Sequence, residues 1–119
     1  MVSTHNFREL KIWQESMILA KLVFAFTKTL PDSERFGLIS QMNRAVVSVS
    51  SNIAEGSARK SDKHFIQFLE TSLGSLFELE TQLLLCVEFD YSDLSSVQSM
   101  IDKIHELQKM IYGFKKTLS

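Results

Sequence analysis

The chain has 119 residues, a length that predicts a single domain spanning residues 1–119. Thirteen lysines and arginines stand against fourteen aspartates and glutamates, so the molecule as a whole is not a cation that attracts nucleic acid. Four glycines and one proline leave few places for turns, which indicates long elements. The single cysteine, Cys86, cannot form a disulfide within the chain and fits a reducing, cytoplasmic location. We expect neither a signal peptide nor a membrane span, because the first ten residues are polar and no long uninterrupted apolar run follows.

A first helix is predicted from about residue 6 to residue 29. Its expected core seam repeats at spacings of three and four residues and consists of Leu10, Trp13, Met17, Ala20, Phe24 and Thr27. A second apolar strip consists of Ile12, Leu19, Leu22 and Phe26. Pro31 disfavours helix at the residue before it, and Asp32 or Ser33 is expected to cap the next helix.

A second helix is predicted from about residue 34 to residue 58, with a seam of Ile39, Met42, Val46, Val49 and Ile53. Gly56 stands where the next seam residue would fall, which allows either a close approach of another helix or the start of helix fraying. Ser61 and Asp62 are the expected cap of a third helix, residues 62–89. That helix has two apolar strips and should be covered on two sides; the strips are Phe65, Leu69, Ser72, Leu76, Leu79, Leu83 and Cys86, and Ile66, Leu73, Phe77 and Leu84.

The fourth helix, residues 93–118 with Ser92 or Asp93 as its cap, has the most regular pattern. Spacings of three and four alternate without interruption along Val97, Met100, Ile104, Leu107, Ile111, Phe114 and Leu118. Four helices of similar length joined by short connections predict antiparallel neighbours. The expected fold class is therefore all-α, an antiparallel up-down-up-down four-helix bundle.

A polar stripe interrupts the apolar pattern of the second helix. Its members are three or four residues apart and therefore line up on one helix face: Arg44, Ser48, Asn52 (with Ser51 beside it), Glu55 and Arg59. Three interpretations are open, namely a solvent-exposed face, a hydrogen-bonded network at a seam between helices or subunits, and a contact surface for a ligand or nucleic acid. Serine and asparagine are poor helix formers, which argues against a merely solvated face.

Charges and reactive groups point to binding rather than catalysis. Residues 62–90 contain six acids and one lysine, so the third helix is either a solvated face or an acidic surface for a basic face of another subunit. The three histidines lie in different elements and form no metal motif, and Cys86 falls on an apolar seam where a thiol is unreactive. We expect no metal, no cofactor and no enzymatic activity. Phe7, Trp13, Phe36 and Phe65 fit a core better than a surface for stacking bases.

Three segments resemble a known family. They read FRELKIWQES, LPDSERFGLISQMNRAVVSVSSNIAEGSAR and FIQFLETSLGSLFELETQL. They are similar to the four-helix-bundle proteins encoded in intervening sequences of bacterial 23S ribosomal RNA, a superfamily that includes the accessory variability determinant of diversity-generating retroelements. The resemblance runs from about Phe7 to Phe89 and, in helical pattern only, to the C-terminus.

This resemblance implies a ring-like homopentamer without catalytic activity, and the gene location of the family suggests association with ribosomal RNA. Two departures bear on that expectation. The family usually has proline before the SNIAEG segment, where this chain has Val49 and Ser50, so a milder helix bend is expected. The retroelement relatives are strongly basic, whereas this chain is slightly acidic. The sequence thus predicts an oligomeric binding or scaffold protein, either associated with RNA or serving as a protein–protein interaction module without nucleic acid.

Overall fold

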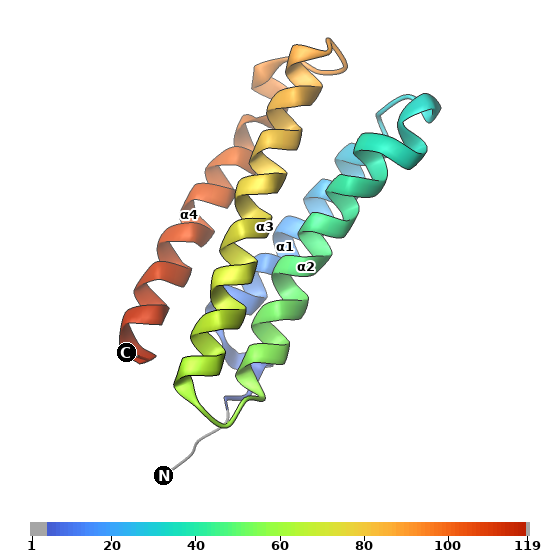
Figure 1. Ribbon diagram of the computed structural model, residues 1–119. Coiled ribbons are helices and arrows are strands. Elements are labelled where there is room, and N and C mark those ends of the chain that lie inside the picture. Colours follow the sequence, from blue (N-terminus) through green and yellow to red (C-terminus); the bar gives the residue numbers. More distant parts are fainter. Residues whose placement is uncertain (1–4, 119) are drawn as a thin grey trace.

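Four long helices make up the computed structural model, which describes residues 5–118 (Figure 1). They are α1 (Lys11–Thr27), α2 (Ser40–Ser57), α3 (Asp62–Glu88) and α4 (Leu94–Leu118). Three short segments of tighter or wider helix precede α1 and α2: η1 (Phe7–Glu9), η2 (Asp32–Glu34) and η3 (Arg35–Ile39). No strand is present among these residues. The all-α prediction is confirmed.

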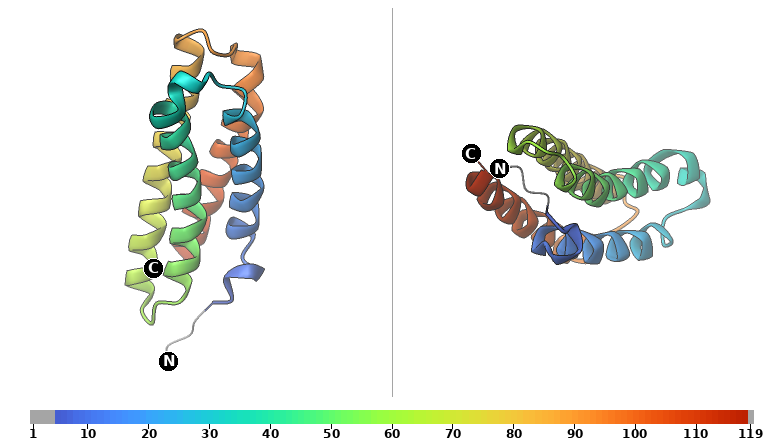
Figure 2. Two further views of the ribbon diagram at one scale, coloured as in Figure 1. Left: turned by 90° about the vertical axis from the view of Figure 1, so that its right-hand side faces the viewer. Right: turned by 90° about the horizontal axis from the view of Figure 1, so that it is seen from below.

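The helices run alternately up and down along a rod of 52 × 24 × 19 Å. Each helix packs on its neighbours in the order α1–α2–α3–α4, and α4 closes the bundle against α1. Seen from one end, α1 and α3 lie at opposite corners (Figure 2). The predicted antiparallel four-helix bundle is therefore confirmed. We call the end with the α2–α3 connection the lower end and the end with the α1–α2 and α3–α4 connections the upper end.

The first helix begins later than residue 6. The Asn6 side chain accepts a hydrogen bond from the Arg8 amide at 3.2 Å and thereby caps the short turn η1. Leu10 then adopts an extended backbone (φ −75°, ψ 125°), which separates this turn from α1. The helix ends at Thr27, two residues before the predicted boundary.

The cap of the second helix is also different from the prediction. Neither Asp32 nor Ser33 caps it; the Glu34 side chain accepts a hydrogen bond from the Leu38 amide at 3.1 Å. The following stretch is a wide helical turn in which Gly37 departs from helical geometry (φ −105°, ψ −114°). The glutamate side chain is two bonds longer than that of serine and one bond longer than that of aspartate, so its carboxylate can reach over this wider turn. From Ser40 to Ser57 the helix continues without interruption through Val49 and Ser50.

The other two caps follow the sequence prediction. Ser61 Oγ accepts from the His64 amide at 3.1 Å, and the Asp93 carboxylate accepts from the Ser96 amide at 2.9 Å. Between α3 and α4, Asp90 has a positive φ of 62° and Tyr91 N–H donates to Cys86 O at 2.9 Å. This arrangement ends a helix through one left-handed residue, a place that glycine usually occupies.

The core contains the predicted seam of α3 and most of the predicted seams of the second and fourth helices, of which Ile39, Phe114 and Leu118 are only partly buried. Gly56 is buried, and a Cβ atom there would lie 2.7 Å from Phe68 Cβ and 2.8 Å from Phe65 Cδ1, so of the two expectations for this glycine the close approach holds. Phe65 is buried as expected, but Phe36 is not in the core, because 89% of its surface is exposed.

The predicted seam of α1 is only partly correct. Thr27 is buried and Leu10, Trp13 and Ala20 pack against the core, whereas Met17 and Phe24 are exposed. The buried stripe of α1 is Ile12, Ser16, Leu19, Val23 and Thr27, which mixes members of both predicted strips with two residues that neither contained. Ser16 Oγ lies 2.6 Å from Trp13 O and 2.9 Å from Ser50 Oγ, and these hydrogen bonds make its burial possible.

One predicted strip of α3 is also only partly covered. Leu73 is buried, but Phe77 and Leu84 are 53% and 43% exposed. The bundle thus covers α3 fully on one side and leaves apolar side chains of its outer side uncovered within this chain.

Candidate functional site

The polar stripe of α2 divides between a helix seam and the solvent. Ser48 and Asn52 are half-buried between α2 and α3. Asn52 Nδ2 donates to Ser48 O at 2.8 Å and to Ser48 Oγ at 3.0 Å, and Ser75 Oγ on α3 lies 2.9 Å from Ser48 Oγ. Deeper in the same seam, Ser72 Oγ donates to Val49 O at 3.0 Å. Small hydroxyl side chains therefore join α2 to α3 where two larger apolar side chains would hold the helices further apart.

The charged members of the stripe point outward. Arg59 and Glu55 form an exposed ion pair at 3.3 Å, one helical turn apart, and the Arg59 guanidinium lies 5.0 Å from the centre of the Phe68 ring. Arg44 is exposed on the upper part of the same helix. The sequence prediction treated the five residues as one surface. The structure places two of them in a hydrogen-bonded seam within one chain and three of them on the outside.

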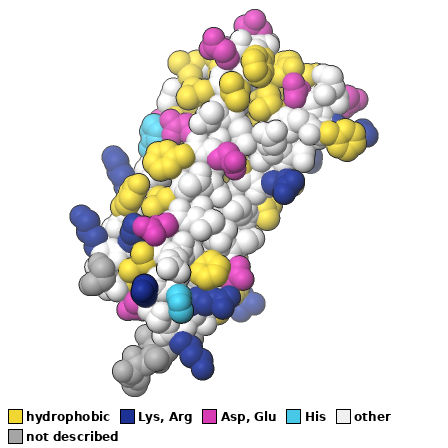
Figure 3. Space-filling model, in the orientation of Figure 1, with side chains coloured by type: hydrophobic (Ala, Val, Ile, Leu, Met, Phe, Trp, Pro, Cys, Tyr) yellow, Lys and Arg dark blue, Asp and Glu magenta, His cyan; other side chains and the backbone are white. Residues whose placement is uncertain are grey.

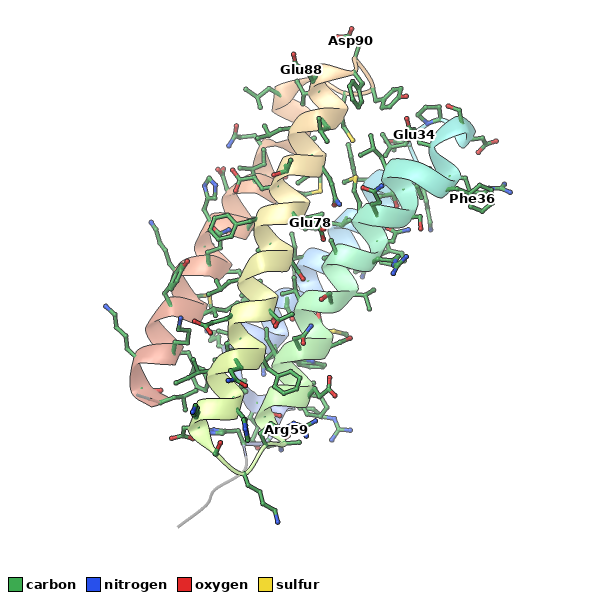
Figure 4. The ribbon with its side chains drawn as sticks, in the orientation of Figure 1. Glu34, Phe36, Arg59, Glu78, Glu88 and Asp90 are labelled. Atoms are coloured by element: carbon green, nitrogen blue, oxygen red, sulfur yellow. The ribbon has the colours of Figure 1, made fainter. Side chains whose placement is uncertain are left out.

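A groove lies beside Arg44 between α2 and α3. Its volume is about 310 Å³, and its lining is mostly polar or small: Gln41, Arg44, Ala45, Ser48, Ser75, Glu78 and Gln82. Glu78 stands on α3 in the middle of the rod (Figure 4). Gln82 is buried, and its Oε1 has no hydrogen-bond partner among the described residues. Gln82 was not predicted from the sequence. It lies one heptad after Ser75, and both residues are therefore on the side of α3 that faces α2.

Positive charge is concentrated at the lower end of the bundle. Residues 5–11, 55–70 and 109–118 meet there and contain eight lysines and arginines but four acids, a net charge of +4. The rest of the chain therefore carries −5. Figure 3 shows basic side chains around this end, and Arg59 lies at the end of α2 (Figure 4). We call this region the basic end.

The acids of α3 have different partners along its length. Glu70 pairs with Lys115 of α4 at 3.4 Å, and Glu80 lies 3.0 Å from Nε2 of His105, which is also in α4. Among the described residues, Glu78 and Glu88 form no ion pair. The acidic third helix predicted from the sequence is thus partly neutralised by α4, and Glu78 and Glu88 remain exposed.

Histidine, cysteine and acidic side chains are the possible metal ligands and nucleophiles of the part of the chain that the structure describes. Within residues 5–118, no three histidine, cysteine, aspartate or glutamate side chains gather as a metal site. Cys86 is buried against Met42, and burial raises the pKa of its thiol, with a smaller contribution from the Glu34 carboxylate. None of the helices in that part combines the length and apolar character that crossing a bilayer requires.

Fold and surface together define a small four-helix bundle with a polar, small-residue seam and a basic end. The family model of the 23S rRNA-intervening sequence proteins matches residues 8–113. The chain therefore belongs to this family, which confirms the resemblance seen in its sequence.

The fold is also seen in a solved structure. It is a protein of unknown function from the S23 ribosomal protein family of Bacteroides thetaiotaomicron, 24% identical to this chain, with a TM-score of 0.81. The alignment covers 88% of this chain and 98% of the other. No curated protein matches the chain.

Proposed function

We propose that this protein is a non-catalytic scaffold that assembles with copies of itself and binds structured RNA through its basic end. The basic end carries the RNA part of the proposal, because phosphate contacts dominate affinity for nucleic acid and require clustered lysine and arginine. A net charge of +4 in one region supplies this cluster although the whole chain carries −1. Assembly in a ring brings several basic ends together, and a pentamer is the number that the family resemblance favours.

A gel-shift or anisotropy titration with a hairpin RNA tests the RNA part. Lys60 and Lys63 are exposed at the α2–α3 connection, so the double variant Lys60→Ala/Lys63→Ala should weaken binding. It should also lower the slope of log affinity against log salt by about 1–2. The matched control is Arg35→Ala/Lys103→Ala, which removes the same charge elsewhere. Absence of binding at low ionic strength, or equal effects of the two variants, contradicts RNA binding by the basic end.

The alternative function is a protein–protein interaction module without nucleic acid. It is favoured by a separate observation: of the exposed large apolar side chains, Tyr112 alone lies within the described ranges of the basic end, and the others lie elsewhere on the bundle. Light scattering tests assembly in both cases. A mass that is a multiple of 13.6 kDa supports self-assembly, and a single species of 13.6 kDa at all concentrations contradicts it.

A further inference from the structure

The outer side of α3 combines uncovered apolar groups with negative charge. Phe77, Leu84 and Leu85 are between 36% and 53% exposed. Glu78 and Glu88 lie on the same side at helical spacing, and no lysine, arginine or histidine occurs between Thr71 and Asp90. Figure 3 shows apolar and acidic side chains interspersed over the upper part of the visible face. We call these five residues the acidic α3 face.

The outer side of α1 has the opposite charge and the same apolar character. Met17, Ile18 and Leu22 are between 37% and 45% exposed, although they belong to a helix of a packed bundle. Lys21 and Lys28 lie on the same side, and neither pairs with a carboxylate within the described part of the chain. The single acid of α1, Glu15, is directed to α4 and pairs there with Lys103 at 3.7 Å. We call these five residues the basic α1 face.

The two faces cannot meet within one molecule, because α1 and α3 lie at opposite corners of the bundle (Figure 2). They are of similar length: in each, the first and last members are eleven positions apart, about 17 Å along a helix. A stripe of uncovered apolar side chains rimmed by one sign of charge is typical of an interaction surface. The exposed apolar groups add a driving force that grows with the area they bury.

The chain itself offers the complementary occupant. Two acidic α3 faces would bring like charges together, and so would two basic α1 faces. The basic end provides positive charge but, apart from Tyr112, no large exposed apolar side chain among its described residues. Of these surfaces, the basic α1 face of a second copy supplies both the charge and the apolar area.

We propose that the acidic α3 face of one copy docks onto the basic α1 face of the next copy. This inference rests on the proposed self-assembly and identifies the surfaces that carry it. Such a contact joins two different patches, so a pair of copies retains one free face of each kind, and the chain of copies grows until the rotation closes it into a ring. The basic end lies outside both faces and stays available in the assembled protein.

Charge reversal tests the pairing directly. The variants Lys21→Glu/Lys28→Glu and Glu78→Lys/Glu88→Lys each place like charges opposite one another, and analytical ultracentrifugation should show that each shifts assembly to at least tenfold higher concentration. The fourfold variant that combines them exchanges the two charges and should recover the mass of the unmodified protein. The matched controls are Lys60→Glu/Lys109→Glu and Asp102→Lys/Glu106→Lys, which alter exposed residues outside both faces and should assemble normally.

The outcomes separate this inference from the proposed function. If the unmodified protein assembles but both face variants keep its mass, the contact lies elsewhere and the inference is wrong while self-assembly stands. Failure of the fourfold variant to reassemble, with far-ultraviolet circular dichroism showing an intact fold, also contradicts the pairing. A monomer of 13.6 kDa at every concentration contradicts self-assembly itself.

Discussion

The two ends of the bundle are held together by different interactions. At the lower end, Gly56 lets α2 approach α3 so closely that Phe65 and Phe68 touch its backbone. The Phe65 ring also contacts Phe114 of α4, with 5.5 Å between ring centres, and the ring of His5 at 5.3 Å. This end joins three helices and the N-terminal segment through one cluster of rings.

The upper end depends on longer side chains and polar groups. The ribbons of α2 and α3 spread apart there (Figure 1), and Met42 and Cys86 lie between them with 3.9 Å between their sulfur atoms. The Tyr91 hydroxyl donates to Glu34 Oε2 at 2.8 Å and links the two connections of this end. The upper end thus adds a hydrogen bond between its two connections to its apolar core, and Phe36 remains in solvent there (Figure 4).

Replacing one phenylalanine at each end gives the largest expected contrast. Phe65→Ala removes a ring that is 1% exposed and leaves a cavity among α2, α3 and α4, so we expect a loss of about 3–5 kcal/mol of unfolding free energy. Phe36→Ala removes a ring that contributes little to the core and should change that free energy by less than about 0.5 kcal/mol. Urea unfolding of both variants measures the difference, and similar losses would show that Phe36 packs against the bundle instead of remaining in solvent.

Gly56 provides the next test of the close contact at the lower end. In Gly56→Ala the added methyl group overlaps Phe68 Cβ and Phe65 Cδ1, so the helices must separate, at a cost of about 1–3 kcal/mol. Gly74 is the matched control because it is also in a helix but has open space around it. Gly74→Ala should stabilise the protein by about 0.5–1 kcal/mol through helix propensity. A stabilising Gly56→Ala would show that the predicted steric conflict is absent.

The same two ends explain what the sequence predicted well and where it failed. The close contact at Gly56 was one of two expectations, because a glycine at a seam position of a heptad pattern permits either close approach or fraying. The cap by Glu34 could not be predicted from the sequence. Its carboxylate reaches over a wide turn that contains Gly37, and it also accepts a hydrogen bond from Tyr91, 57 residues away. Sequence rules describe caps of regular turns, so they favoured Asp32 and Ser33.

The polar stripe of α2 and the buried side of α1 were likewise predicted only in part. The regular spacing of the polar stripe was visible in the sequence. Which members are buried and which are exposed was not, because Ser48 lies in the seam through its hydrogen bond with Ser75 of α3. The buried stripe of α1 was not predicted, because it takes members from both apolar strips and adds the polar Ser16. Hydrophobic patterns thus identify helices with two apolar sides, and tertiary hydrogen bonds decide which side is buried.

A smaller change is expected at the α3–α4 connection. Asp90 has a left-handed backbone, which is strained for a residue with a Cβ atom. Asp90→Gly relieves that strain, and we expect a gain of about 0.5–1 kcal/mol, partly offset by the greater freedom of glycine in the unfolded chain. Asp90→Ala removes the same charge without relieving the strain and should not stabilise. Thermal unfolding of the two variants separates backbone strain from charge, and equal melting temperatures would exclude strain as the cause.

The smallest effect concerns the polar link of the upper end and depends on pH. The Leu38 amide and the Tyr91 hydroxyl donate to Glu34, and these hydrogen bonds hold the pKa of its carboxyl below the ordinary value of 4.5. The folded protein therefore binds this proton less readily than the unfolded chain does. The stability that the carboxylate contributes is complete above pH about 4.5 and is lost as the pH falls through the lowered folded-state pKa.

The variant Glu34→Gln should accordingly be less stable than the unmodified protein at neutral pH, and the difference should shrink as the pH is lowered. Hydrogen bonds from Ser96 and Ser95 also hold the pKa of the Asp93 carboxyl low. This residue is present in both proteins, so its contribution to the dependence of stability on pH cancels in the comparison. Tyr91→Phe removes one of the two donors and should produce a smaller difference with the same dependence on pH. Because solvent screens this exposed group, a loss that stays constant from pH 7 to pH 3 would mean that Glu34 acts through the shape of the turn rather than through its charge.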